Sequence, residues 1–244
     1  MSESRDGLRI AMWSGPRNIS TAMMRSWENR SDSVVWDEPM YAAYLHRTGV
    51  DHPGRDEIIE SQNTDLDGVV AMLHGRDEPP VQYAKHMAQH VPDDMDLTWT
   101  LSQFNVLLLR EPREVVASFV RERGACEAWE IGLLQQQRLY AYWRDHRVDA
   151  PVIDSADFLD DPSAYLQHLC TWAGIPFETG MLGWPAGPRD SDGVWARYWY
   201  DAVHASTGFA PYRARAVELS EHDASVAEAC RDAYDELRAA RITL

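Results

Sequence analysis

Two arginines follow apolar runs of the sequence closely, in positions from which they could hold an anion. Arg17 lies in the stretch "SGPRNIST", Ser14–Thr21, which follows the apolar run Leu8–Trp13. Arg110 follows a second apolar run, Asn105–Leu109. A guanidinium group presents a planar fork of N–H donors that matches the oxygens of a phosphate or sulfate group. The two positions therefore predict contacts with an anionic ligand.

The stretch around Arg17 contains the other parts of an anion-binding turn. Gly15 permits a tight turn, and the hydroxyl groups of Ser20 and Thr21 can donate to phosphate oxygens. An ordinary capped turn between a strand and a helix is the structural alternative, but such a turn needs no arginine. We therefore predict that the whole turn binds the ligand, through these residues: Gly15, Pro16, Arg17, Asn18, Ile19, Ser20 and Thr21.

This turn is not a Walker A motif. Ser20, Thr21 and Ala22 stand where that motif requires Gly, Lys and a hydroxyl residue. The apolar run Asn105–Leu109 is followed by Arg110 and not by the aspartate of a Walker B motif. We therefore predict no metal site, and a metal-bound nucleoside triphosphate is disfavoured as the ligand.

The apolar runs that would position these residues alternate with helical patterns. Such alternation is typical of an α/β protein, in which helices cover a central parallel sheet in three layers. Five runs are predicted to be strands: Leu8–Trp13, Ser33–Trp36, Val81–Ala84, Asn105–Leu109 and Pro151–Ile153.

Apolar stripes predict several of the helices. Ile19, Met23, Met24 and Trp27 recur at helical spacing after the first strand. Two later stripes are predicted to lie in the core: Tyr165, Leu166, Leu169, Cys170 and Ala173 in one, and Val226, Cys230, Ala233, Tyr234 and Leu237 in the other. A helix over roughly 127–147 is also expected. Its aromatic face, with Trp129, Tyr140 and Trp143, fits either the core or an apolar acceptor pocket.

Composition limits the class of protein. The 244 residues fit one large domain, and we predict a single domain over residues 1–244. With 39 acidic against 23 basic side chains, the net charge is -16, so neither nucleic acid nor an anionic membrane is expected as a partner. Cys126, Cys170 and Cys230 lie far apart and are predicted to be buried thiols. No apolar run could span a bilayer, and the start "MSESRDG" is not a signal peptide, so we expect a cytoplasmic protein.

The stretch "SGPRNIST" resembles the 5'-phosphosulfate loop of the sulfotransferase family. Arg17 stands at the family's lysine or arginine position, and Ser20 and Thr21 match its hydroxyl pair. The stretch "NVLLLREPREVVASF" resembles the family's 3'-phosphate segment, in which an arginine at a strand end and a serine eight residues later hold the phosphate. Arg110 and Ser118 have that spacing.

The resemblance is closest to short bacterial members of the family, and it implies a P-loop nucleotide hydrolase-like sulfotransferase fold. It also implies that the donor is 3'-phosphoadenosine 5'-phosphosulfate (PAPS), that the product is 3'-phosphoadenosine 5'-phosphate (PAP), and that no metal takes part. The Arg-Lys-Gly loop that encloses the adenosine in vertebrate cytosolic members has no counterpart here. The segment Asp192–Phe209 is our candidate for that role.

Transfer to a hydroxyl group needs a base near the acceptor. Glu38, which follows a short apolar strand, resembles the acidic base of some bacterial members, although a charge that complements a helix dipole is an equal alternative. His86 is the second candidate base. Lys85 and Arg17 are the predicted electrostatic stabilisers, and His90 is expected to be a surface group.

Taken together, the sequence predicts a sulfotransferase that acts on a hydroxyl or amine of a small-molecule acceptor. A metal-dependent P-loop kinase is one alternative, since it shares the fold. A non-catalytic nucleotide-binding module is the other. The identity of the acceptor and the oligomeric state are left open, because acceptor pockets are built from variable loops.

Overall fold

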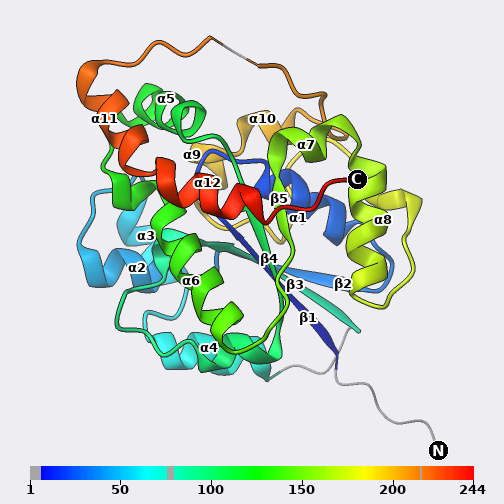
Figure 1. Cartoon of the computed structure of the whole chain (residues 1–244). Coiled ribbons are helices and arrows are strands. Elements are labelled where there is room, and N and C mark those ends of the chain that lie inside the picture. The colour runs from blue at the N-terminus through cyan, green and yellow to red at the C-terminus, as the bar shows by residue number, and fades with distance from the viewer. Residues whose placement is uncertain (1–6, 76–79, 215) are drawn as a thin grey trace, which may run out of the picture.

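The computed structural model describes residues 7–75, 80–214 and 216–244 (Figure 1). Residues 1–6, which contain most of the polar start used in the expectation about signal peptides, lie outside the described residues. The strands are β1 Leu8–Ser14, β2 Ser33–Asp37, β3 Val81–Met87, β4 Phe104–Leu109 and β5 Val152–Asp154. The five predicted strands are thereby confirmed.

Helices follow or separate the strands. The longer ones are α1 Ser20–Glu28, α2 Tyr41–Thr48, α3 Arg55–Ser61, α4 Leu66–His74, α5 Pro112–Arg123, α6 Leu133–Asp145, α8 Pro162–Trp172, α11 Glu221–Ala229 and α12 Arg231–Ala239. Shorter ones are α7 Ser155–Asp160, α9 Ala196–Trp199 and α10 Asp201–His204, with 3-10 turns η1 Ala88–His90, η2 Thr98–Ser102, η3 Ala128–Ile131 and η4 Thr179–Leu182.

All five strands run parallel in one sheet with the order β2-β3-β1-β4-β5. The sheet is buried on both faces, which explains why its strands read as apolar runs and not as alternating patterns. One core layer packs α4, α5, α6, α11 and α12 against the sheet. The other packs α1, α7 and α8 against the opposite face, as Figure 1 shows. The predicted α/β three-layer fold is confirmed.

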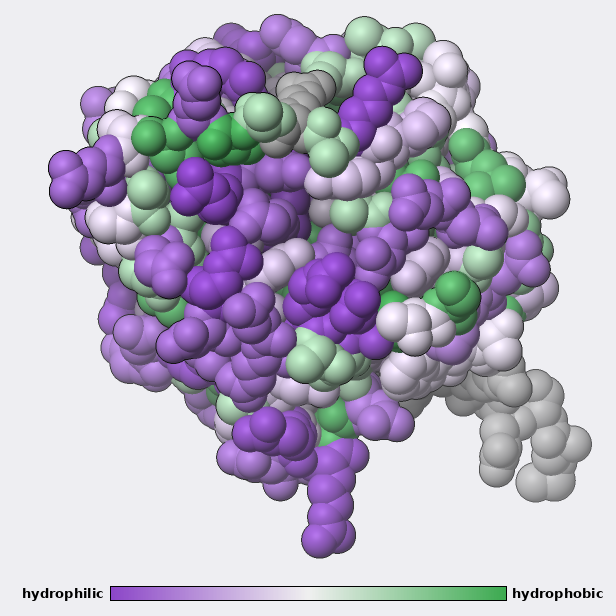
Figure 2. Space-filling view, turned by 45° about the horizontal axis from the view of Figure 1, so that its top comes forward, coloured by the Kyte–Doolittle hydropathy of each residue, from purple (hydrophilic) through white to green (hydrophobic). Residues whose placement is uncertain are grey.

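A third cluster of buried residues lies apart from these two layers. It joins α2 and α3 to the segment around α9, through Tyr41, Leu45, Ile58, Trp195 and Tyr200. This cluster fixes a late segment of the chain beside the start of α2. The surface is largely hydrophilic on the face drawn in Figure 2, in keeping with the net charge of -16.

Two predicted helices are interrupted. The expected helix over 127–147 is wrong in its first part, because Gly132 adopts a positive φ of 79° between η3 and α6. Trp129 lies in η3 and is exposed, whereas Trp143 lies in α6 and is fully buried, so the two do not share one face. The C-terminal stripe is buried as predicted, but Cys230 separates it into α11 and α12. All three cysteines are buried free thiols, as predicted.

Candidate active site at the carboxyl edge of the sheet

Four neighbouring strands bring the predicted site residues to one edge of the sheet. Glu38 follows β2, Lys85 lies near the end of β3, Arg17 follows β1, and Arg110 follows β4. The helices after β1 and β4 cover opposite faces of the sheet. The edge between these two strands is therefore a topological switch point, which is where open α/β sheets bind ligands.

Arg17 is held in an unusual backbone conformation. Its φ is 56°, a left-handed conformation that costs a residue with a side chain about 1 to 2 kcal/mol. The carbonyl oxygen of Arg17 accepts a hydrogen bond of 2.5 Å from Nη1 of Arg110, and its own Nε donates to the hydroxyl oxygen of Ser118 at 3.0 Å. The two motifs that the sequence separates by about ninety residues thus contact each other directly.

Arg110 also binds an acid in the first turn of α5, the helix that follows it. Its Nε and Nη2 donate to Oε2 of Glu114 at 3.1 and 3.0 Å, and the hydroxyl of Tyr212 donates to the other oxygen of Glu114 at 2.6 Å. The guanidinium group has five N–H donors. Three are used in these bonds and in the bond to Arg17, so among the residues that the structure describes two N–H groups remain for a ligand, while the side chain is 29% exposed.

The electrostatic environment of Arg17 favours an anion. Burial lowers the pKa of its guanidinium group, and the positive charges of Arg121 and Arg110 lower it further, against the opposing effect of Glu122. The Glu122 carboxylate lies 3.6 Å from Nη2 of Arg17 and is 44% exposed, so it compensates this charge only weakly. A bound anion would relieve the repulsion between the arginines.

The rest of the turn is fixed by packing and by local hydrogen bonds. A Cβ atom on Gly15 would collide with the carbonyl oxygen of Ile131, so a close approach of two backbones, and not a positive φ, requires glycine here. Pro16 is buried beside it. Asn18 donates from Nδ2 to the carbonyl of Leu108 at 3.0 Å and accepts from the amide of Ile19 at 2.8 Å.

The turn leads into the first turn of α1. Ile19 is the N-cap residue, and no side chain caps this helix. Ser20 is buried and Thr21 is half-buried. The first amide groups of a helix have no partner within it, and together with the helix dipole they attract an anion. The geometry of all seven turn residues is therefore compatible with the predicted anion site.

The sequence suggested that Lys85 lies at a polar strand end. In the structure it lies inside β3. The strand continues to Met87, and the Lys85 side chain is 1% exposed. Its Nζ donates to Asp37 Oδ1 at 2.9 Å, to Glu38 Oε1 at 2.8 Å and to the hydroxyl oxygen of Tyr200. Because an ammonium group has three N–H donors, these bonds use all of them.

Glu38 is the second non-glycine residue with a positive φ at this edge, and its φ is 40°. Its amide donates to the carbonyl of Lys85, and its carbonyl accepts from the amide of Tyr41 and from Nε2 of Gln62. Burial raises the pKa of its carboxyl group, with Asp37 adding to the rise and Lys85 opposing it. α2 begins only at Tyr41, so neither acid lies in the first turn of that helix.

The two histidines differ from the sequence expectations. His86 is 1% exposed and stacks on Trp13 with ring centroids 4.2 Å apart, on the face of the sheet opposite to Lys85. Burial lowers its pKa to about 3. His90 is not a surface group: it is buried and stacks on Tyr41 and Tyr44 with centroids 4.7 and 4.5 Å away. The sequence around these histidines does not predict their stacking partners, because Trp13, Tyr41 and Tyr44 lie far away in the chain.

The segment Asp192–Phe209 contributes residues that the sequence did not single out. The hydroxyl of Tyr200 donates to Asp37, with both carboxylate oxygens 2.8 Å away, and accepts from Nε1 of Trp195 at 3.1 Å. The amide of Gly193 donates to Asp37 Oδ2 at 3.0 Å. Asp192 binds Nη2 of Arg25 at 2.5 Å, which anchors the segment to α1. No local pattern predicts these contacts, because the partners lie far apart in the chain.

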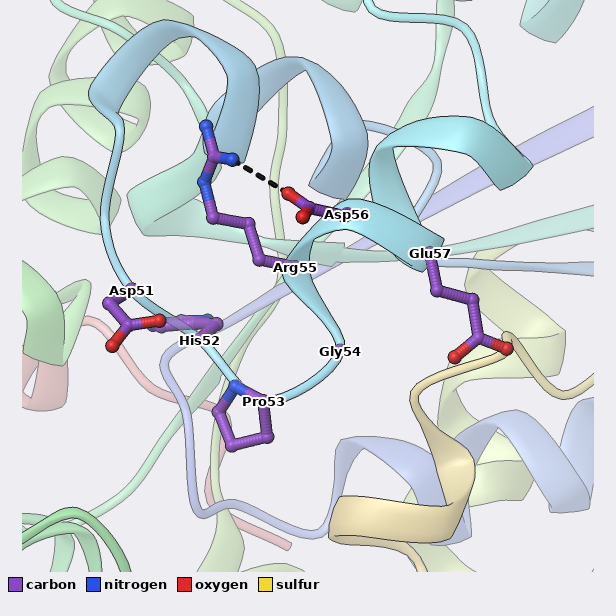
Figure 3. A pocket seen from close by; sticks show the side chains of 7 residues that line it. All are labelled: Asp51, His52, Pro53, Gly54, Arg55, Asp56 and Glu57. Carbon is purple, nitrogen blue, oxygen red and sulfur yellow. Dashed lines mark hydrogen bonds and ion pairs between the residues drawn. The ribbon is translucent and has the colours of Figure 1, made fainter.

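An open hollow of about 570 Å³ lies along residues 51–57, between α2 and α3 (Figure 3). Arg55 and Asp56 form an ion pair of 3.0 Å within it, and Glu57 extends toward the segment of α9, where it pairs with Arg197. The Nδ1 atom of His52 lies 2.6 Å from the hydroxyl of Tyr41. One lining residue of the hollow therefore contacts Tyr41, which lies three residues after Glu38.

Within residues 7–75, 80–214 and 216–244, no group of three or more His, Cys, Asp or Glu side chains is arranged to hold a metal ion. Nor does any helix in the part of the chain that the structure describes have the length and apolar character needed to cross a membrane.

Both the sequence and the fold of this chain match those of known proteins. A model of the sulfotransferase domain family matches residues 8–239. Two curated relatives from Arabidopsis thaliana are named branched-chain-amino-acid aminotransferase-like protein 2 and protein 1. The first is 34% identical over 201 residues, which cover 82% of this chain and 36% of the relative. The second is 34% identical over 217 residues, which cover 88% and 39%. This chain thus spans little more than a third of their length.

Solved structures show the same fold. The sulfotransferase domain from the curacin biosynthetic pathway matches with a TM-score of 0.55 and 18% identity, over 92% of this chain and 98% of that one. The sulfotransferase domain from the Synechococcus PCC 7002 olefin synthase matches with a TM-score of 0.53 and 14% identity, over 94% and 98%. At these identities the likeness concerns the fold alone.

Proposed function

The chain belongs to the sulfotransferase domain family, and from that premise we propose that it transfers a sulfuryl group from PAPS to a small-molecule acceptor. The acceptor group is a hydroxyl or an amine, the nucleotide product is PAP, and the transfer proceeds in line without a metal ion. The curated relatives are much longer than this chain, so the proposal concerns the activity of this domain.

The contact between the two arginine motifs is the observation that carries the proposal. Arg110 donates to the backbone of Arg17, and Arg17 donates to Ser118, at the switch point of the sheet. A nucleotide with an anionic group at each end of its ribose would be bound by two neighbouring cations of this kind. Both arginine side chains are more than a quarter exposed, which leaves them accessible to such a ligand.

In this proposal the donor would lie along the edge in one direction. The phosphosulfate would lie against Arg17 and the uncapped first turn of α1, and the 3'-phosphate against Arg110 and Ser118. Glu114 now binds Arg110, and the two remaining N–H groups of that arginine would take the phosphate. The adenine would contact the segment Asp192–Phe209.

Glu38 is the proposed base. It would take the proton of the acceptor hydroxyl as the acceptor oxygen bonds to sulfur and the bond between sulfur and the phosphate oxygen breaks. The negative charge that develops on that leaving oxygen would be stabilised by Arg17 and the amides of α1. Since the N–H groups of Lys85 all bind protein groups, we assign Lys85 to holding Asp37 and Glu38.

The acceptor would approach from the side of the hollow at residues 51–57. Tyr41 connects that hollow to Glu38, because its hydroxyl lies close to His52 and its amide donates to the carbonyl of Glu38. An open hollow with charged walls suits a polar acceptor better than a large apolar one.

Transfer of ³⁵S from labelled PAPS to a panel of alcohols, phenols, sugars and amines, with and without EDTA, tests the proposal. We expect a labelled product whose formation EDTA does not reduce and which E38Q forms at least about 100-fold more slowly. Thermal-shift titrations with PAP and with ATP, each with and without Mg²⁺, separate the alternatives. Magnesium-dependent ATP turnover would establish a kinase, and PAP binding without transfer to any acceptor would indicate a nucleotide-binding module.

A further inference from the structure

We propose that Tyr200 is a positioning residue of the transfer site: its hydroxyl fixes Asp37 and Lys85, and Lys85 in turn fixes the carboxylate of Glu38. This inference rests on the proposed function, in which Glu38 is the base. It concerns a residue 162 positions away from Glu38 in the sequence, on the turn between α9 and α10.

The hydrogen bonds of the Tyr200 hydroxyl leave it a single orientation. A phenol has one proton to donate and two lone pairs that can accept. The proton goes to Asp37, whose two oxygens both lie 2.8 Å away, whereas Oε1 of Glu38 lies farther off at 3.5 Å. The lone pairs accept from Nε1 of Trp195 at 3.1 Å and from Nζ of Lys85. The side chain is 4% exposed, so water does not compete for these bonds.

The ammonium group of Lys85 transmits this orientation. It binds Asp37, Glu38 and Tyr200 with its three N–H groups, and turning it would break at least one bond in a buried site. Oε1 of Glu38 is therefore fixed at 2.8 Å from Nζ. Without the Tyr200 oxygen, one N–H of the ammonium would lack an acceptor, and the carboxylate of Glu38 would lose its fixed position.

The charges of Lys85, Asp37 and Glu38 favour Glu38 as the group that accepts a proton. One ammonium group faces two carboxylates, so one carboxylate is left without a balancing charge. Tyr200 and the amide of Gly193 both donate to Asp37, so protein donors occupy the oxygens of that carboxylate. The side chain of Glu38 is 11% exposed, against 2% for Asp37, so it is also the one that a substrate reaches.

Titratable groups face Glu38 from four parts of the fold. Asp37 faces it from β2, Lys85 from β3, Tyr200 from the turn after α9, and Tyr41 from α2. Burial and the charge of Glu38 raise the pKa of Tyr41, so Tyr41 stays neutral while Glu38 titrates. The burial that raises the pKa of Glu38 supports the assignment.

The segment that carries Tyr200 has its own anchor. Asp192 binds Arg25 at 2.5 Å and Nε2 of His204 at 3.0 Å, which holds the segment on both sides of Tyr200. The ring of Tyr200 also remains in place when only its oxygen is removed. The substitution Tyr200→Phe should therefore remove the hydrogen bonds while leaving the segment docked.

The test compares Y200F with a matched control, Y83F. Tyr83 is fully buried two residues before Lys85 on β3, and its hydroxyl has no hydrogen-bond partner in the part of the chain that the structure describes. The pKa of Glu38 is measured by NMR on protein with ¹³C-labelled glutamate carboxyl groups, and the Glu38 signal is assigned as the one absent from E38Q. This readout needs no acceptor.

In Y200F we expect a higher pKa for Glu38 than in the wild type. Asp37, having lost its phenol donor, would draw Lys85 toward itself, and Glu38 would lose part of the stabilisation of its ionised form. In Y83F the Glu38 pKa should stay at the wild-type value. With an acceptor identified, kcat of Y200F should fall about 10- to 100-fold while KM for PAPS is unchanged, since orientation and not donor binding is lost.

A Glu38 titration in folded Y200F that matches the wild type would refute the positioning role. If Y200F does not fold, W195F takes its place: it removes the indole donor to Tyr200, and it must raise the Glu38 pKa for the proposal to stand. A wild-type protein that sulfates no acceptor contradicts the proposed function, while the NMR comparison still decides whether Tyr200 controls Glu38.

Discussion

Nη1 of Arg110 donates a hydrogen bond of 2.5 Å to the backbone carbonyl oxygen of Arg17. Arg110, the first residue after β4, thus holds the backbone of Arg17 in a left-handed conformation, which is unfavourable for a residue with a side chain. Because this bond uses only one of the five N–H groups, Arg110 can support the loop and still bind an anion. The same relationship makes the two arginines distinguishable by experiment.

Replacing Arg110 by alanine should weaken PAP binding about 10- to 100-fold, the size of a lost charge-assisted hydrogen-bond pair. Adenosine 5'-phosphosulfate, which lacks the 3'-phosphate, should lose much less affinity. Isothermal titration calorimetry with both ligands checks this, and R113A, which removes an exposed arginine from the first turn of α5, is the control. Unchanged PAP affinity in R110A would mean that the second motif has been misassigned.

Replacing Arg17 by alanine should slow transfer about 100- to 1,000-fold and also weaken donor binding, since its guanidinium group would bind the transferred group and stabilise the leaving oxygen. R17K should recover part of the rate, because a cation returns without the second prong of the fork. Single-turnover rates at saturating PAPS separate the two effects. A loss confined to affinity would contradict a role in the chemical step.

Glu38→Gln should reduce the transfer rate about 100- to 10,000-fold with PAP affinity intact. In the wild type the base acts in its ionised form, so the rate should fall as the pH drops through the Glu38 pKa. Burial raises that pKa, so the fall should lie above pH 4.5, the ordinary value for glutamate. The pH profile of kcat/KM measures it, with the exposed acid variant E60Q as the control.

His86→Phe should leave transfer intact and change the dependence of stability on pH. Burial holds the pKa of folded His86 at about 3, whereas the unfolded value is about 6.5, so the unfolded chain binds more protons between these values. Folding stability therefore declines as the pH falls from about 6.5 toward 3, and H86F should lose less stability over that range. Urea unfolding at several pH values checks the sign. Loss of transfer in a folded H86F would restore His86 as a base.

Gly15→Ala should destabilise the protein by about 1 to 3 kcal/mol, because the new methyl group would collide with the backbone of Ile131. Gly180→Ala is the matched control, since a Cβ there meets only ordinary contacts. Chemical denaturation of both variants gives the comparison. If G15A were as stable as the wild type, the loop after β1 and η3 could move apart without a free-energy cost, which would contradict the tight packing of Gly15 against Ile131.

The strands and the two arginine motifs could be predicted because their signals are local. A parallel strand covered on both faces reads as a continuous apolar run, and the residue after such a run lies at the carboxyl edge of the sheet. Arg17, Glu38 and Arg110 could thus be placed at one edge before the strand order was known. The interruption of the helix at Gly132 was missed, because the apolar spacing continues across it.

The sequence by itself therefore determined the layers of the fold and which residue types meet at the edge of the sheet. Only the tertiary structure decided that Lys85 is buried between two carboxylates, that His86 turns away from them, and that Tyr200 holds Asp37 from 163 residues away. The physical reason is that a buried charge or phenol is stabilised by partners on other elements, and the identity of those partners is set by packing and not by neighbours in the chain.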